Sequence, residues 1–598
     1  MFNTLLLCLS LIFIVFPVRA EEMKNNYIAE YFIPSPSRTT QADVHYSITL
    51  QNPTGKEASE QFLISIPSSF RATDIAGVVN EKTVAVQSSL EQNQLNIIVP
   101  LATDEDLKDK LNISLNFKQE NILTQQGQVY ELLIPTLLPS LKTESSVLVH
   151  LPAELRNSVI LSKPMFSSRT SDTLSWNRVD GKTIQVAFGK GQNFAVKLRY
   201  QLENSSPLPS KATVAFPPDT IGQRVIFKSL TEAPENITVD HDGNVLAKYL
   251  LSPSQKKEIV YTADILLYQV ANEEVATYQK KQFQSQKKYL LKPFSSGLDN
   301  APKFSSINSV YSYVLATLSY DYSQLSNNSP RYRHKPISEI LGSPSNSVCL
   351  DYSSLFISLA RQNALYAREI IGYGFSPNEQ IRPQSGDILH AWAEYYNLEK
   401  NQWFAVDPTW EDTSKIDYFS SLDLNHIALA IRGESSASPY PAGFFRFKTP
   451  SDTNLVSITY ADSVPQIKKS IELKLKKGSA AITAGNSATY LFTVRNSGNV
   501  TQYNLPVSAE GEDLDIRLSS KVIDVIAPLQ TVSITADLKP NRFTHNDGTE
   551  FKLVVGDNKY QHRLKILPAG YNIAFVSSFS VLSVLILILI VVKRFKNA

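Results

Sequence analysis

Cys349, His390 and Asp407 occur in that order within residues 347–410, and their side chains are of the types that cooperate in nucleophilic catalysis. A thiol is an effective nucleophile only as the thiolate. A helix N-terminus or a neighbouring imidazole lowers the pKa of a cysteine from about 8.5 to ~3.5–7.5. A carboxylate bonded to the imidazole fixes its tautomer and orientation. The three residues therefore predict a nucleophile, a general base and an orienting group.

The sequence around Cys349 predicts that this residue opens a helix. Gly342 and Pro344 prevent an earlier helix start, and Ser345 or Asn346 can cap the first turn. Cys349 would then lie at the positive end of the helix dipole. The apolar residues that recur at helical spacing after it are Leu350, Leu355, Phe356, Leu359 and Ala360.

His390 and Asp407 are predicted to meet across a β-hairpin. Side chains alternate along residues 389–397, so His390 and Trp392 share one face of a strand. Residues 398–401 are polar enough to turn, and residues 403–407 return as the partner strand. If the turn centres between residues 399 and 400, Asp407 lies opposite Trp392 and diagonal to His390, within reach of the imidazole.

These motifs resemble the transglutaminase-like superfamily, a papain-like cysteine fold, over residues 304–410. The resemblance implies that Cys349 is the nucleophile, His390 the general base and acid, and Asp407 the orienting group. The residues that carry it are Tyr320-Asp321-Tyr322, Cys349-x-Asp351-Tyr352, Arg361 and Arg368 on one run, Gly372-Tyr373, His390-Ala391-Trp392 and Asp407-Pro408-Thr409-Trp410.

The sequence also departs from that family. Ser347 stands where family members often carry glycine, and residues 301–348 contain no tryptophan. Transglutaminases proper use an upstream tryptophan to help bind the oxyanion, so crosslinking is less firmly implied than thiol chemistry. We expect the Cys349 backbone N–H to hold the oxyanion together with Tyr320 or Tyr322, and Trp392 to support the site by packing in the hairpin.

Length and composition predict an exported, multi-domain protein. The 598 residues suggest three or four domains, and a net charge of +2 gives no sign of nucleic-acid binding. Residues 1–20 read as a signal peptide, with an uncleaved N-terminal anchor as the alternative. Residues 573–592 read as a transmembrane helix. The basic residues among 593–598 then predict a cytoplasmic tail, with the bulk of the chain extracytoplasmic.

The two cysteines support the same interpretation. Cys8 would leave with the signal peptide, so Cys349 would be the single thiol of the exported part. Exported chains usually pair or lose their cysteines, which makes a lone thiol inside the motif hard to explain by packing.

The remaining sequence is rich in alternating, strand-like segments separated by Gly, Pro, Asn and Ser. We expect β-sandwich modules at 26–205 and 206–272, a linker or solvated helix at 273–302, an α+β papain-like domain at 303–449 and an immunoglobulin-like β-sandwich at 470–567. His426 could in principle be a rival base, but no acid is evident on an adjoining strand, so we interpret it as structural. No metal cluster or cofactor motif is evident.

Two functions fit this pattern. The first is an ectoenzyme that transfers the acyl group of a peptide or protein amide through a thioester, which water or an amine then resolves. The alternative is a surface scaffold or adhesin whose transglutaminase-like domain only binds peptide or cell-wall polymer, a role that β modules and an anchor fit equally well.

Overall fold

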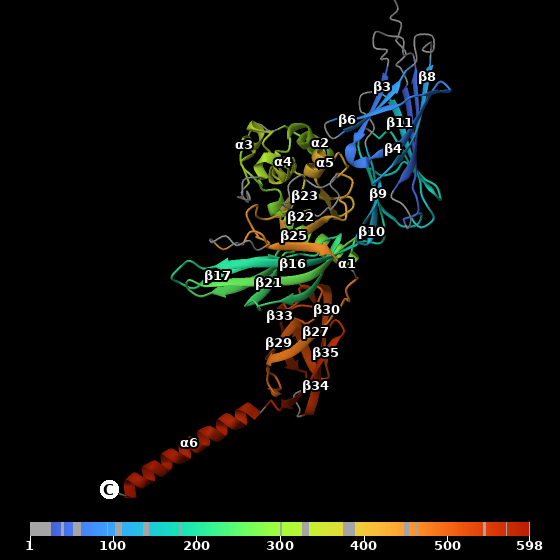
Figure 1. Cartoon of the computed structure of the whole chain (residues 1–598). Coiled ribbons are helices and arrows are strands. Elements are labelled where there is room, and N and C mark those ends of the chain that lie inside the picture. The colour runs from blue at the N-terminus through green and yellow to red at the C-terminus, as the bar shows by residue number, and fades with distance from the viewer. Residues whose placement is uncertain are drawn as a thin grey trace, which may run out of the picture. The chain divides into compact units, whose positions relative to one another are not determined.

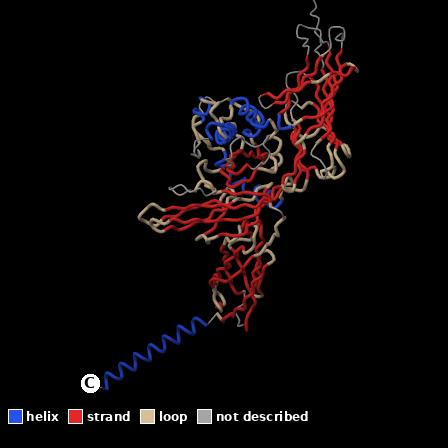
Figure 2. Tube along the Cα trace, in the orientation of Figure 1, coloured by secondary structure: helices blue, strands red, loops and turns tan. Residues whose placement is uncertain are grey.

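The computed structural model describes most of the chain, and Figure 2 shows that strands dominate it while the few helices gather mainly in one region. The described residues are 25–36, 41–51, 61–91, 94–101, 110–135, 143–179, 182–298, 302–325, 334–374, 389–445, 447, 454–461, 463–541, 546–569 and 571–596. The predicted signal peptide at 1–20 lies outside them. The chain is a β-rich, multi-domain protein that divides into two compact units.

The first unit comprises Met1–Thr124, Leu133–Asn157 and Met165–Lys182. It holds an eight-stranded sheet in the order β13-β14-β11-β1-β2-β8-β4-β5 and a three-stranded sheet in the order β3-β7-β6. Buried and more exposed side chains alternate along β8, so one face of this strand packs in the core. The strands are β1 Asn25–Phe32, β2 Ala42–Gln51, β3 Gln61–Pro67, β4 Ala72–Val79, β5 Lys82–Val84, β6 Gln87–Glu91, β7 Gln94–Pro100, β8 Lys110–Gln119, β11 Thr143–His150, β13 Ser168–Arg169 and β14 Thr173–Asn177.

The second unit comprises Gln125–Leu132, Ser158–Pro164 and Thr183–Ala598. Its first part contains the sheets β18-β21-β16-β26 and β17-β20-β19, which bury one common core. The strands are β12 Val159–Lys163, β15 Ile184–Phe188, β16 Gln192–Glu203, β17 Ser210–Phe216, β18 Gln223–Leu230, β19 Asn236–Val239, β20 Val245–Leu251, β21 Lys256–Leu267 and β26 Val456–Tyr460; β9 Leu123–Gln126 and β10 Val129–Ile134 each contribute residues to both units.

The module boundary expected near residue 205 does not separate two modules in this structure. β16, on one side of that residue, pairs along its whole length with β21 on the other side. β16 also pairs with β26, whose residues follow the predicted catalytic domain. Strand alternation shows where strands lie but not which strands pair, so the sequence pattern could not reveal this sheet.

The segment 273–302, for which a linker or solvated helix was expected, contains the helix α1, Glu273–Leu290. The side chain of Asn272 caps it by accepting the backbone N–H groups of Glu274 and Val275. One side of α1 is buried: Phe283 stacks on Tyr396, with ring centroids 3.5 Å apart. The helix is therefore neither a free linker nor fully solvated.

The region that carries the predicted catalytic residues is a four-stranded sheet, β24-β23-β22-β25, with α4 packed against β22 and β23 (Figure 1). All twelve residues of α4 from Leu350 to Arg361 are buried, although several of them are polar. The elements are α2 Ile307–Thr317, α3 Ile337–Gly342, α4 Cys349–Gln362, β22 Ala367–Gly374, β23 Leu389–Asn397, β24 Gln402–Val406, α5 Pro408–Ser414 and β25 His426–Arg432, with the 3₁₀ turn η2 at Tyr322–Leu325.

The C-terminal part is a sandwich of the sheets β27-β29-β33-β31 and β28-β35-β34-β30-β32 around one core. The strands are β27 Ile471–Lys477, β28 Ala481–Thr483, β29 Ala488–Asn496, β30 Gln502–Gly511, β31 Leu514–Leu518, β32 Val522–Ile526, β33 Thr531–Pro540, β34 Asn546–Val555 and β35 Asn558–Leu567. The helix α6, Tyr571–Lys596, follows. Within the residues that the structure describes, no helix combines the length and apolar character needed to cross a bilayer.

Candidate active site

Cys349 is the first residue of α4, as the sequence predicts, but the cap differs from the expectation. Val348, not Ser345 or Asn346, is the N-cap residue. The carboxylate of Asp351 accepts the backbone N–H of Val348 at 3.0 Å and the ammonium group of Lys335 at 2.8 Å. Asp351 thus satisfies a backbone donor at the helix start and fixes the turn that presents the thiol.

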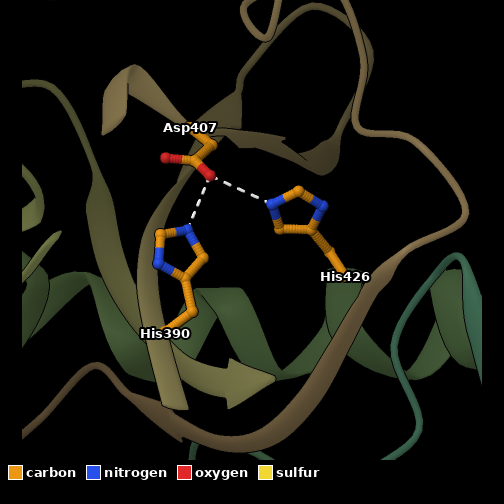
Figure 3. Close-up of side chains that lie close together, drawn as sticks. All are labelled: His390, Asp407 and His426. Atoms are coloured by element: carbon orange, nitrogen blue, oxygen red, sulfur yellow. Dashed lines mark hydrogen bonds and ion pairs between the residues drawn. The ribbon is translucent and has the colours of Figure 1, made fainter. Parts of the chain in front are cut away.

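The hairpin has the register that the sequence predicts. Asn397 pairs with Gln402 and Ala393 with Val406, so the turn centres between residues 399 and 400. Continuing this register places Asp407 across from Trp392. The side chain of His390 then meets Asp407: Nε2 of the imidazole lies 2.7 Å from Oδ2 of the carboxylate (Figure 3).

Both members of this pair are buried, His390 with 8% of its surface exposed and Asp407 with none. Burial alone would lower the pKa of His390, but its attraction and hydrogen bond to Asp407 and its hydrogen bond to Cys349 outweigh burial and raise that pKa to about 9. Because Nε2 binds Asp407, Nδ1 is the nitrogen left for the thiol. The structure thus brings Cys349, His390 and Asp407 together in that order.

Asp407 is also the N-cap of α5, which explains how a charged carboxylate is tolerated inside the protein. Its Oδ1 accepts the backbone N–H groups of Thr409 and Trp410 at 2.9 and 3.2 Å. Pro408 occupies the first helical position, where the missing N–H has no intrahelical role. Burial would raise the pKa of Asp407, but the imidazoles of His390 and His426 hold it well below its usual value.

His426 is the main correction to the sequence prediction. We expected it to lack an acidic partner, yet its Nε2 lies 3.0 Å from Oδ2 of Asp407 and its Nδ1 lies 2.7 Å from Oδ1 of Asp423. Figure 3 shows the two imidazoles of His390 and His426 directed at the same carboxylate oxygen. Burial would lower the pKa of His426, but the two carboxylates outweigh burial and raise it to about 9.

The sheet topology explains why both histidines reach Asp407. β22 lies between β23 and β25, with Gly372 paired to His390 and Gly374 paired to His426. Directly paired residues point to the same face, as do residues two apart in a strand, so the two histidines flank the two glycines on one face. The local spacing Asp423-x-x-His426 could have indicated the pair of these two residues, but the contact of His426 with Asp407 has no local sequence signal.

The glycines leave room for two indole rings. A Cβ on Gly372 would lie 2.3 Å from Trp392, and a Cβ on Gly374 would lie 2.5 Å from Trp410. Trp392 stacks on His390 with centroids 5.9 Å apart, and Trp410 lies 4.4 Å from the ring of His426. Trp392 therefore supports the site by packing against the imidazole.

The two tyrosines considered for the oxyanion take different places. Tyr320 packs in the apolar cluster that includes Cys349, and its backbone pairs with Ser347 just before α4. Tyr322 lies on η2 with 38% of its surface exposed, and its ring contacts that of Tyr320. Of the two, Tyr320 is the one that packs against the same apolar cluster as Cys349. Arg368 lies on β22 rather than on the helical run with Arg361, since α4 ends at Gln362.

His390, Asp407 and His426 are also residue types that bind metal ions, and their candidate ligand atoms lie within 4.8 Å of one another. Two ligands of a tetrahedral zinc ion, each 2.0–2.1 Å from the metal, are separated by about 3.3 Å. The nitrogen–oxygen separations of 2.7 and 3.0 Å are instead those of charge-assisted hydrogen bonds. We therefore interpret the group as a hydrogen-bonded chain.

Comparisons with known proteins bear on the same segment. Residues 293–408 match the family model described as the transglutaminase-like superfamily. That match includes Cys349, His390 and Asp407. No curated protein matches the chain.

Solved structures are similar only at low identity. A protein from Cytophaga hutchinsonii, provisionally named a cysteine protease, is 16% identical with a TM-score of 0.30, over 46% of this chain and 93% of that one. The periplasmic domain of TgpA from Pseudomonas aeruginosa is 13% identical with a TM-score of 0.19, over 38% and 92%. An M1 zinc metallopeptidase from Deinococcus radiodurans is 13% identical with a TM-score of 0.19, over 31% and 45%.

The family match locates the thiol, the imidazole and the carboxylate within one recognised domain. Residues 293–408 of this chain form a transglutaminase-like domain.

Proposed function

We propose that the protein transfers the acyl group of a peptide or protein amide to water or to an amine through a thioester on Cys349. The observation that carries the proposal is the buried hydrogen bond between His390 and Asp407, together with the hydrogen bond of the same imidazole to the Cys349 thiol. A thiol, an imidazole and an orienting carboxylate in this order are the parts that thiolate catalysis requires.

The reaction would proceed in two halves. The Cys349 thiolate attacks the amide carbon, and the imidazolium of His390 gives its proton to the departing amine as the carbon–nitrogen bond breaks. A thioester then links the acyl group to the sulfur. Water or an amine attacks this thioester, His390 accepts the proton of the attacking group, and the thiolate leaves. Resolution by water gives a peptidase, amidase or deamidase reaction, whereas resolution by a lysine amine gives crosslinking.

The negative charge that develops on the carbonyl oxygen needs donors close to the sulfur. The first N–H groups of a helix lack intrahelical acceptors, so the backbone N–H of Cys349 is one candidate. Tyr320, which packs against the same apolar cluster as Cys349, is the better placed of the two tyrosines for the second.

The first experiment alkylates Cys349 with iodoacetamide across pH in the full chain carrying Cys8→Ser, which leaves a single thiol. We expect alkylation between pH 6 and 7, where an ordinary thiol is protonated, and we expect His390→Ala to abolish it. Alkylation that begins only near pH 8.5 and is unaltered in His390→Ala would instead support the non-catalytic scaffold.

The second experiment separates catalysis from mere thiol reactivity. Casein-type amide and amine donors are incubated with the wild type and with Cys349→Ala, and released ammonia, new amine termini and crosslinked products are measured. Turnover in the wild type that is absent from Cys349→Ala supports acyl transfer, and the product identifies the resolving nucleophile. Equal signals from both chains would exclude Cys349 as the nucleophile.

We also propose that residues 573–592 anchor the protein in a membrane, with residues 593–598 cytoplasmic and the catalytic domain outside. Large apolar side chains between Val581 and Val592 are exposed on α6, and basic residues follow them. The C-terminal sandwich would then act as an immunoglobulin-like spacer. Flotation with phospholipid vesicles tests this: the full chain should float and a chain ending at residue 569 should not, whereas equal flotation would exclude the anchor.

A further inference from the structure

His426 is a fully enclosed histidine that bonds a carboxylate at each ring nitrogen. It begins β25, 1% of its side chain is exposed, and its partners are Asp407 at 3.0 Å and Asp423 at 2.7 Å. The catalytic steps proposed above do not use it. A buried, titratable group bonded directly to the orienting carboxylate therefore needs an explanation of its own.

The proton count on this histidine follows from its partners. A neutral imidazole carries one N–H and can donate to only one carboxylate, whereas an imidazolium donates to two. Asp407 is held ionised by two backbone N–H donors and by His390. Asp423 accepts the hydroxyl of Tyr418 and the backbone N–H of Asn425, and the imidazole of His426 holds its pKa well below the usual value against burial. With both carboxylates ionised, His426 is an imidazolium.

We propose that His426 is a positioning residue for the Cys349 site, an imidazolium that clamps Asp407 from the side opposite His390 and shares the negative charge of its Oδ2 atom. The inference rests on the proposed function, because it concerns how Asp407 acts on the base of that reaction.

The clamp has a geometric effect. Oδ1 of Asp407 accepts two backbone N–H groups of α5, and Oδ2 accepts one N–H from each imidazole. With four donors the carboxylate cannot rotate without breaking several charge-assisted hydrogen bonds. His390 is consequently held in the orientation that turns Nδ1 towards the thiol.

The positive charge of His426 also acts on the pKa of His390, in the direction opposite to the effect of Asp407. Asp407 favours the protonated form of His390, which keeps the proton on the base. The positive ring of His426 lies 5.6 Å from the ring of His390, centroid to centroid, and like charges disfavour protonation. His426 therefore makes the His390 imidazolium a stronger acid, better able to release its proton to the departing amine.

Other charged groups face this chain from the neighbouring elements. Lys163 on β12 is fully buried, its ammonium group lies 3.2 Å from the centre of the Tyr418 ring, and it is attracted by Asp423. Burial lowers the pKa of Lys163 to about 8 and raises that of Glu131 to about 7. Asp407 and Asp423 act on His426 directly, and Lys163 and Tyr418 act on Asp423. Asp423 repels the carboxylate of Glu131, while Asp417 and Glu411 attract Lys163.

The competing interpretation is that His426 only fills space between aromatic rings. It touches Trp410 with centroids 4.4 Å apart and Trp392 with centroids 5.2 Å apart, so its loss would disturb packing in any case. A packing role predicts changes in stability alone. A positioning role also predicts a change in the pH at which His390 loses its proton.

The test measures that pH through the thiol, with the full chain carrying Cys8→Ser. Alkylation rates with iodoacetate, an anion, and iodoacetamide, a neutral reagent, are compared across pH. A protonated His390 beside the thiolate attracts the anionic reagent, so the ratio of the two rates falls when His390 deprotonates. The midpoint of this fall reports the protonation of His390 and not the fold.

We expect His426→Gln, which removes the charge but can still donate one N–H to Asp407, to move this midpoint upward by about one pH unit. Asp423→Asn should move it in the same direction by less, because His426 then loses one of the two carboxylates that keep it protonated. His334→Gln is the matched control: His334 is a partly buried histidine paired with another carboxylate, that of Glu369 at 3.1 Å, and its loss should leave the midpoint in place.

The outcomes separate the two proposals. If the His426→Gln protein melts at the wild-type temperature and the pH midpoint of its alkylation-rate ratio is unchanged, the positioning role is overturned. If His426→Gln does not fold, Asp423→Asn decides in the same way. The ratio of the two alkylation rates should fall with pH in the wild type and not in His390→Ala. If the wild type shows no such fall, the proposed catalytic function is wrong, and the role of His426 is wrong with it.

Discussion

At the scale of single residues, the site depends on one oxygen atom. Oδ2 of Asp407 receives hydrogen bonds from two imidazoles inside the protein, where hydrogen bonds to a charged group contribute about 1.5–3 kcal/mol each. An unpaired buried carboxylate would be strongly destabilising, so the two histidines and the two backbone donors of α5 also explain why Asp407 can be charged there at all.

Asp407→Asn tests the orienting role. The amide keeps the shape of the side chain but loses the charge that outweighs burial at His390, so the pKa of His390 should fall from about 9 towards or below 6.5. We expect the thiol to lose its reactivity at pH 6 to 7 and acyl transfer to drop by roughly 10²–10⁴-fold. Alkylation rates across pH measure the first effect and initial velocities the second.

Asp417→Asn is the control for that change. Asp417 also caps a turn, by accepting the backbone N–H groups of Phe419 and Ser420, but it does not bond either histidine. Its replacement should leave the pH midpoint of Cys349 alkylation within a few tenths of a unit of the wild-type value. Equal losses in both variants would show that any lost carboxylate in this loop region damages the site.

Most of the residue-level site could be predicted, because its signals are local. Cys349 at a helix start and the hairpin that joins His390 to Asp407 depend on helix stops, alternation and one turn. His426 could not be placed, because its contact with Asp407 depends on β25 pairing with the far side of β22. Alternation along a strand does not identify its neighbour in the sheet.

At the scale of elements, the central strand β22 sets the spacing of the site. Gly372 and Gly374 lie between the two histidines and leave room for Trp392 and Trp410. The indoles in turn pack against the imidazoles, so two glycines without side chains control where both imidazoles lie.

Gly372→Ala should therefore damage the site from a distance. The new methyl group would lie 2.3 Å from Trp392 and from the carbonyl oxygen of Ile427, and the backbone oxygen cannot move aside easily. We expect a loss of stability of about 1–3 kcal/mol and slower alkylation of Cys349, because Trp392 would shift the ring of His390. Thermal melting and alkylation kinetics measure the two effects.

Gly342→Ala provides the comparison. Gly342 ends α3, and a Cβ there meets nothing within 4 Å. This substitution should change the free energy of unfolding by less than about 0.5 kcal/mol and leave the rate of Cys349 alkylation unaltered. If the two alanine variants behaved alike, close packing at Gly372 would not be the reason for its effect.

At the scale of the whole molecule, the buried histidines couple folding to pH. The pKa values of His390 and His426 are about 9 in the folded chain, whereas that of an unfolded histidine is near 6.5. Both histidines thus contribute stability that is fully present below pH 6.5 and is lost as the pH rises towards 9. Lys163, whose pKa burial lowers to about 8, acts in the opposite direction above pH 8.

The free energy of unfolding should therefore decline between pH 6.5 and 8, on the order of 1–3 kcal/mol. Urea denaturation at pH 6, 7 and 8, followed by tryptophan fluorescence, measures the decline, since the indoles of Trp392 and Trp410 lie beside the imidazoles. His426→Gln should show a shallower decline. A urea midpoint that is the same at pH 6, 7 and 8 in the wild type would contradict the raised pKa values of the two histidines.

The pairing of β16 with β26 determines how a pulling force would reach the transglutaminase-like domain. The chain leaves this sheet after β21 and returns to it at β26, so the domain is an excursion between strands of one sheet. Phe194, near the start of β16, pairs with Tyr460 at the end of β26. Tension applied to the two ends of the protein would consequently unzip these strands from that pair, one hydrogen bond at a time, before the load reached the catalytic sheet.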